Sequence, residues 1–94
     1  MGRWKVKTIY KYEIPFDDEF KVNLPTGAEI VSVQSQHNTP HMWCIVETTA
    51  PTRPTSFILH GTGHPMNGHE GKHLASFQIN NGSLVFHLFE DTRR

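Results

Sequence analysis

Histidine is the residue type whose number and spacing first suggest chemistry. The 94-residue chain contains seven histidines, and four of them fall in one region at intervals of four or five residues: His60, His64, His69 and His73. On a helix this spacing would place imidazoles on one face, but the intervening glycines and Pro65 exclude a helix. A metal site needs three or four ligands near 2 Å, and even with Glu70 added this spacing matches no recognised metal motif. We therefore expect solvated loop histidines and no bound metal.

The hexapeptide HGTGHP is the second feature that points to a ligand. It comprises His60, Gly61, Thr62, Gly63, His64 and Pro65, and we expect it to follow the end of a strand. Its two glycines let a ligand approach backbone N–H groups, and a nest of such groups favours anions. The threonine hydroxyl and the two imidazoles add further hydrogen-bonding groups. This combination would suit a phosphate or the edge of a nucleotide; the alternative is a tight turn that only needs glycine.

Two residues outside the hexapeptide could contact the same ligand. Arg53 lies in a connection bracketed by prolines, where a guanidinium can hold a phosphate through two hydrogen bonds or simply be solvated. Trp43 could stack on a base, although its place in an alternating strand favours burial in the core. The candidate ligand-binding set therefore consists of His60, Gly61, Thr62, Gly63, His64, Arg53 and Trp43.

Catalytic signatures are weak in this sequence. Cys44 lies in the middle of an apolar segment, where a buried, inert thiol is expected, and no serine stands in a G-x-S-x-G context. We assign no catalytic residue and no cofactor, and we expect binding rather than turnover. The alternative enzyme is a metal-independent phosphodiesterase that acts on a cyclic nucleotide, with His60 and His64 as acid and base.

Alternation of apolar and polar residues predicts the elements that position these groups. Period-2 patterns and turn residues recur at intervals of about ten residues, which is typical of an all-β sandwich or partly open barrel. We expect six to eight mostly antiparallel strands, and the Asn80-Asn81-Gly82 sequence predicts a hairpin. The strands are expected at residues 4–14, 20–24, 28–36, 42–46, 57–59, 74–79 and 84–89, with loops at 49–54 and 61–72.

Composition narrows the class of protein further. Residues 1–94 are expected to form one domain, since single domains typically contain about 100–150 residues. Nine basic and nine acidic residues give no net charge, which disfavours a nucleic-acid-binding protein. No apolar run is long enough to span a bilayer, and the N-terminus lacks the apolar region of a signal peptide. The single cysteine suits a reducing compartment such as the cytoplasm.

A small chain with unpaired strand edges also favours a homo-oligomer. A domain of this length buries only about two-thirds of the surface that its unfolded chain exposes, and free strand edges need to be covered. The expected contact is the long first strand, through three of its aromatic residues: Trp4, Tyr10 and Tyr12.

Four stretches together resemble a small family of unknown function encoded mainly by bacteriophages and prophages. They are KTIYKYEIP, PTGAEIVSVQ at residues 25–34, FILHGTGHP and GSLVFHLFE. The resemblance spans nearly the whole chain and implies the cytoplasm of an infected bacterium as the location, but it carries over no catalytic residue. By analogy of class, it implies an oligomeric protein that binds a nucleotide-derived immune signal of the host and sequesters it. The alternative is a structural or interaction protein that binds a phage or host protein or single-stranded nucleic acid.

Overall fold

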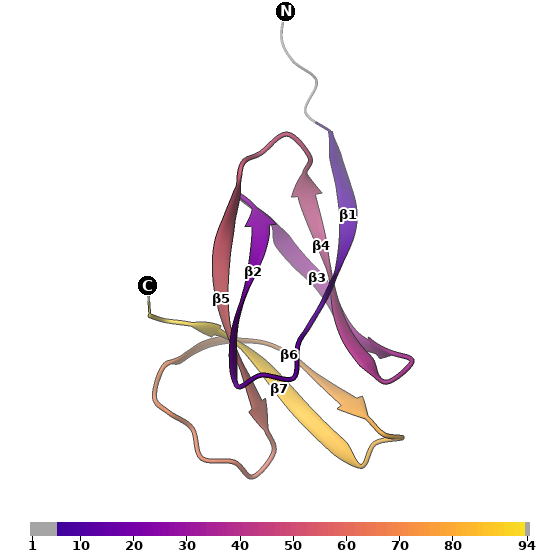
Figure 1. Cartoon of the computed structure of the whole chain (residues 1–94), viewed down its shortest axis with the longest axis vertical. Coiled ribbons are helices and arrows are strands. Elements are labelled where there is room, and N and C mark those ends of the chain that lie inside the picture. Colours follow the sequence, from indigo (N-terminus) through magenta and orange to yellow (C-terminus); the bar gives the residue numbers. More distant parts are fainter. Residues whose placement is uncertain (1–5, 94) are drawn as a thin grey trace, which may run out of the picture.

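The computed structural model describes residues 6–93, and these residues form a two-layer β-sandwich (Figure 1). Seven strands and no helix are present in this range, so the all-β expectation is confirmed. Accordingly, no helix among residues 6–93 is long and apolar enough to cross a membrane. The strands are β1 (Lys7–Glu13), β2 (Glu19–Pro25), β3 (Glu29–Gln36), β4 (Thr39–Glu47), β5 (Thr52–Gly61), β6 (Glu70–Ile79) and β7 (Leu84–Asp91).

The strands are divided between two antiparallel sheets that do not close into a barrel. The first sheet has the order β1-β4-β3, and the second has the order β2-β5-β7-β6. Consecutive strands pair directly only in the β3–β4 and β6–β7 hairpins, whereas β1 and β2 each pair with a strand that comes much later in the chain. The segment after β5 lies over the outer face of the second sheet and carries most of the HGTGHP candidates.

The core forms between the inward faces of the two sheets. In β4 the burial alternates strictly, with Met42, Cys44 and Val46 at most 1 % exposed. They pack against apolar residues of the second sheet, including Phe57, Leu59, Phe77, Ile79 and Leu88. The apolar run 42–46 predicts a strand buried on both faces, and this expectation is wrong. Trp43 and Ile45 are only half-buried, because no described element packs on the outer face of the first sheet.

Two hairpin turns meet at one end of the sandwich. His37 and Asn38 both have positive φ and join β3 to β4 as a two-residue loop, which is the type I′ geometry. Asn80 and Asn81 also have positive φ, and they begin the predicted β6–β7 hairpin. The Asn80 N–H donates to Asn38 Oδ1 at 3.1 Å, which fastens the two turns, one from each sheet, to each other.

Two expected loops are shorter than the sequence indicates. Residues 49–54 were expected to be irregular, but Arg53 and Pro54 already belong to β5 and pair with Leu24 and Asn23 of β2. Proline is tolerated there because β7 joins β5 only from Phe57 onward, so that β5 has a free edge at Pro54. Likewise, β6 begins at Glu70 and shortens the irregular stretch expected at 61–72.

Candidate ligand-binding cleft

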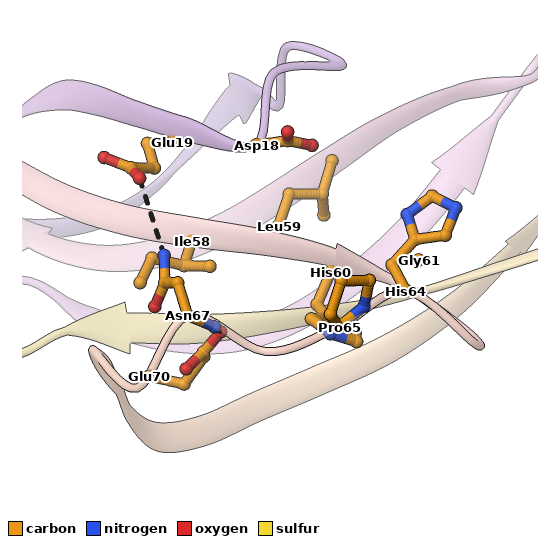
Figure 2. Close-up of a pocket in the computed structure, with 10 residues that line it drawn as sticks. All are labelled: Asp18, Glu19, Ile58, Leu59, His60, Gly61, His64, Pro65, Asn67 and Glu70. Atoms are coloured by element: carbon orange, nitrogen blue, oxygen red, sulfur yellow. Dashed lines mark hydrogen bonds between the residues drawn. The ribbon is translucent and has the colours of Figure 1, made fainter.

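A cleft of about 350 Å³ lies where β5 ends, between the start of β2 and the loop of residues 62–69 (Figure 2). The outward side chains of β5 contribute to its wall, and the loop folds back over them. Its lining residues are Asp18, Glu19, Ile58, Leu59, His60, Gly61, His64, Pro65, Asn67 and Glu70. Of the five candidate residues in the HGTGHP segment, three therefore line this cleft: His60, Gly61 and His64.

The two glycines of the segment have different structural roles. The His64 N–H donates to the Gly61 carbonyl at 3.0 Å, and Gly63 has φ +89°, which closes a tight turn that favours glycine. At Gly61 the backbone is not left-handed, but a Cβ atom would lie 2.9 Å from Cε1 and Nδ1 of the His64 ring. The absence of a side chain at Gly61 therefore lets the imidazole of His64 pack directly on its backbone.

The turn does not offer the row of free N–H donors expected for an anion. The N–H groups of Thr62 and His64 already donate to the carbonyls of Val85 and Gly61. The Thr62 hydroxyl is also engaged, with the Val85 carbonyl at 3.2 Å and His87 Nε2 at 2.8 Å. The tight-turn interpretation of HGTGHP therefore describes the backbone better than the anion-nest interpretation.

Carboxylates dominate the electrostatics of the cleft. Its lining includes Asp18, Glu19 and Glu70 and contains no lysine or arginine. Glu70 accepts hydrogen bonds from the N–H groups of Asn67 and Gly68, both at 3.0 Å, and these donors hold the pKa of its carboxyl below the usual value. The loop over the cleft is thus attached to an ionised carboxylate, and the cavity as a whole is acidic.

An ion pair holds the acidic side of the cleft in place. The Arg93 guanidinium contacts Glu19 at 2.6 Å and Asp91 at 3.0 Å, which ties the end of β7 to the start of β2. The Asn67 amide also reaches Glu19, at 3.5 Å, and so connects the loop to the same carboxylate (Figure 2). Asp18 forms no hydrogen bond or ion pair through its carboxylate within residues 6–93, so it is available to a ligand.

His60 provides the most unusual polar atom of the cleft. Its Nε2 is buried and is the one buried side-chain nitrogen or oxygen without a hydrogen-bond partner among the described residues. The ring has two aromatic neighbours, His64 and Phe89, each with a centroid distance of 6.5 Å. Leaving a buried polar group unpaired typically costs about 1–3 kcal/mol, so a ligand that supplied a partner would gain affinity.

A chain of hydrogen bonds on the same outer face was not foreseen from the sequence. The Thr62 hydroxyl oxygen lies 3.2 Å from the Val85 carbonyl and 2.8 Å from Nε2 of His87. Nδ1 of His87 shares a hydrogen bond of 2.7 Å with the Ser76 hydroxyl, which shares another of 2.9 Å with Nε2 of His73. The tautomers of the two imidazoles set the direction of donation along this series of hydrogen bonds.

The register of the β6–β7 hairpin is the information that would predict this series of hydrogen bonds. The hairpin turn pairs Ile79 with Leu84, and the same register places Ser76 directly opposite His87. His87 is also paired with His60 of β5. Because cross-strand partners project from the same face, the imidazoles of β5, β6 and β7 gather on the outside of the second sheet.

The remaining two candidates lie away from the cleft. Arg53 is exposed near the start of β5, and His60 lies near its end, about 23 Å away at the usual rise of a strand. Trp43 belongs to the other sheet, where its indole packs beside His41 with a centroid distance of 5.9 Å. The structure therefore does not bring Arg53 or Trp43 to the HGTGHP segment.

Neither a metal centre nor an activated thiol is formed by the described residues. Among residues 6–93, no group of three or more histidine, cysteine or acidic side chains is arranged to hold a metal ion. Cys44 is fully buried, and burial raises the pKa of its thiol to about 11. The thiol is therefore protonated near neutral pH, which agrees with an inert core cysteine.

Fold and site together define a seven-stranded antiparallel sandwich with an acidic, histidine-lined cleft on the outer face of its larger sheet. Residues 5–94 match the model of the family described as Domain of unknown function (DUF7352), and the chain belongs to this family. No curated protein and no solved structure matches the chain.

Proposed function

We propose that this protein binds a small nucleotide-derived ligand in the cleft and recognises it through the base rather than the phosphate. The volume of about 350 Å³ falls within the range of small-molecule sites and is sufficient for a nucleoside. Amino and imino N–H groups on the edges of bases are natural donors to carboxylates. Phosphate, in contrast, would face the carboxylates of Asp18 and Glu70, which form no ion pair within residues 6–93, and would meet no lining lysine or arginine.

The unpaired Nε2 of His60, in a cleft that also holds the unengaged carboxylate of Asp18, is the observation that carries this proposal. A base offers donors for the carboxylate, an acceptor or donor for the imidazole, and a flat ring for stacking on His64. The loop of residues 62–69 covers His60 only with exposed side chains, so we expect it to yield when the ligand enters.

Binding without turnover fits the biological role expected from the resemblance to a phage-encoded family, which is sequestration of a nucleotide-derived immune signal of the host. The acidic lining also argues against a phosphodiesterase with His60 and His64 as acid and base, because the scissile phosphate would lie among carboxylates. A sequestering protein needs only a Kd below the concentration of its signal, and it needs no chemical step.

A thermal-shift panel of nucleosides, nucleotides and cyclic nucleotides tests the proposal. A ligand at 100 times its Kd should stabilise the fold by about 2.7 kcal/mol, which corresponds to a Tm increase of about 14 °C for a domain of this size. Asp18→Asn should abolish the shift, whereas Asp17→Asn, its exposed neighbour outside the cleft, should retain it. Chromatography of the incubated ligand should show no product.

Three outcomes would contradict the proposal. One is that no nucleoside or nucleotide raises the Tm, while single-stranded DNA or a host protein does. Another is an equal loss of the shift in the Asp17 and Asp18 variants, which would place the ligand elsewhere. Product formed by catalytic amounts of protein, and lost in His60→Ala, would make the protein an enzyme.

A further inference from the structure

β1 has one edge that no other described strand covers. β1 is the outer strand of the first sheet, and within residues 6–93 it pairs only with β4 (Figure 1). Six of its seven residues are exposed, among them Ile9 at 55 % and Tyr10 at 45 %. We propose that two copies associate by antiparallel pairing of β1 with β1, centred on Tyr10. This proposal is independent of the cleft and its ligand.

The hydrogen bonds to β4 decide which backbone groups of β1 remain available. The Val6 carbonyl accepts from Thr48 N–H, and the Ile14 N–H donates to the Pro40 carbonyl, so even-numbered residues direct their polar groups toward β4. In a strand the direction alternates. The N–H and C=O groups of the odd-numbered residues therefore point outward: Lys7, Ile9, Lys11 and Glu13.

This alternation restricts the possible registers of a two-fold pairing. Outward residues must meet outward residues, so the strand can shift only in steps of two residues. Centred on Tyr10, all seven residues of β1 overlap, and Lys7 lies opposite Glu13 of the partner subunit. Symmetry repeats each contact, which gives two such ion pairs and about eight main-chain hydrogen bonds.

The neighbouring registers place like charges opposite each other. A centre on Ile9 would pair Lys7 with Lys11 of the partner subunit, and a centre on Lys11 would place Lys11 opposite Lys11 of the partner subunit. Like charges directly opposite across a ladder are destabilising. The charge pattern of β1 thus favours one discrete dimer and disfavours the sliding pairings that lead to aggregation at free edges.

Side chains on both faces of the joined strands are compatible with this register. Tyr10 lies opposite Tyr10 of the partner subunit, as a pair without mutual hydrogen bonds, in which side chains approach most closely. Ile9 lies opposite Lys11 of the partner subunit; the Lys11 ammonium donates to Gln36 Oε1 at 3.0 Å across β4, so its charge is held away from the free edge. The dimer would form a continuous six-stranded sheet, in the order β3-β4-β1 and its symmetric copy. Trp4, expected from the sequence at the same contact, lies outside the described residues.

Charge reversal with sedimentation velocity tests the ion pairs of the full-length protein. We expect a species of twice 10.8 kDa for the wild type. Lys7→Glu alone or Glu13→Lys alone should weaken dimerisation about tenfold to a hundredfold, because two attractive contacts become repulsive. An equimolar mixture of the two variants should dimerise again, since both ion pairs are restored between unlike chains. Lys72→Glu, an exposed charge on β6, is the control that should leave the dimer unchanged.

A disulfide test defines the register and does not depend on charge. Two residues opposite each other in a pair without mutual hydrogen bonds have Cα atoms about 4.5 Å apart, within the range that a disulfide spans. Tyr10→Cys should therefore cross-link two chains under mild oxidation, whereas Thr8→Cys, on the same face but offset by four residues from its own copy, should not. Both cysteine variants carry Cys44→Ala as well, because Cys44 lies directly opposite Tyr10 in the β1–β4 ladder and would otherwise compete through a disulfide within one chain.

The proposal is overturned if the wild type remains a monomer throughout the micromolar range. It is also overturned if the dimer persists in both single charge variants, or if Thr8→Cys cross-links as readily as Tyr10→Cys. Circular dichroism spectra of the variants establish that they are folded, and the recovery of dimer in the mixture shows the same for both single charge variants.

Discussion

Replacement of Gly61 by alanine should be unfavourable only while the imidazole of His64 is present. The new Cβ would lie 2.9 Å from two ring atoms of His64, whereas non-bonded carbon atoms prefer about 3.5–4.0 Å. Overpacking of this kind costs about 1–3 kcal/mol, and the exposed position of His64 favours the lower end. Because Gly61 is not left-handed, alanine should in addition stabilise the fold by about 0.4–1 kcal/mol through the unfolded state.

These opposing contributions separate in a double-mutant cycle. We expect Gly61→Ala to change stability by between zero and a loss of about 1 kcal/mol in the wild type, and to stabilise the His64→Ala protein by about 0.4–1 kcal/mol. The coupling of about 1 kcal/mol corresponds to about 5 °C in Tm and is measurable by urea and thermal unfolding. Gly63→Ala is the control, because its φ of +89° makes alanine unfavourable without any contact to relieve.

The cycle would refute the assigned role of Gly61 if alanine had the same effect in both backgrounds within about 0.3 kcal/mol, which is the usual limit of additivity. The same result would mean that His64 does not pack against the end of β5 in solution. If Gly63→Ala showed the same coupling to His64→Ala, the effect would belong to the turn as a whole and not to the contact between Gly61 and His64.

Three further outcomes follow from the described residues. Cys44 should react with a thiol reagent only on unfolding, and stability should decrease from pH 9 toward 11, because the unfolded state loses its thiol proton at lower pH than the folded state does; a pH series of urea unfolding checks this, with Cys44→Ala as the control. Leu88→Ala should lower the free energy of unfolding by about 2–5 kcal/mol, since Leu88 is 0 % exposed, whereas the part-exposed Val85→Ala should have a smaller effect in the same assay. The lowered pKa of Glu70 contributes stability that is present above the usual carboxyl pKa and is lost as the pH falls through the folded value. The protection factors of the Asn67 and Gly68 amides, which compare hydrogen exchange with its intrinsic rate at each pH, should therefore fall in acid in the wild type and be low at all pH values in Glu70→Gln.

The fold class could be predicted because the strands alternate and the turns carry residues that tolerate positive φ. Asn80-Asn81-Gly82 indicates its hairpin directly, and the alternating burial of β4 agrees with the period of a strand. Burial on the outer face of β4 was predicted wrongly, because an apolar run does not reveal whether a second layer covers it. That information depends on how the sheets stack, which the local sequence does not contain.

The candidate site was predictable only in part, for a related reason. His60, Gly61 and His64 are close in sequence and share the cleft, whereas Asp18 and Glu19 reach it through the long-range pairing of β2 with β5. The acidic character of the site therefore could not be inferred from HGTGHP alone. Arg53 would be a reasonable phosphate partner in a flexible loop, but its pairing with Leu24 of β2 fixes it near the start of β5, far from the cleft at the other end of that strand.

The contact between the hairpin turns at Asn38 and Asn80 has a consequence for the order in which the chain folds. The β3–β4 and β6–β7 hairpins are local in sequence, and such hairpins form in about 1–10 μs. β1 and β2, in contrast, must wait for partners that come much later in the chain, and non-local pairing is slow. The Asn38–Asn80 hydrogen bond can align the two early hairpins before the long-range strands add to them. Nucleation should therefore begin at this end of the sandwich, and the strands that form the cleft and the β1 edge should assemble last.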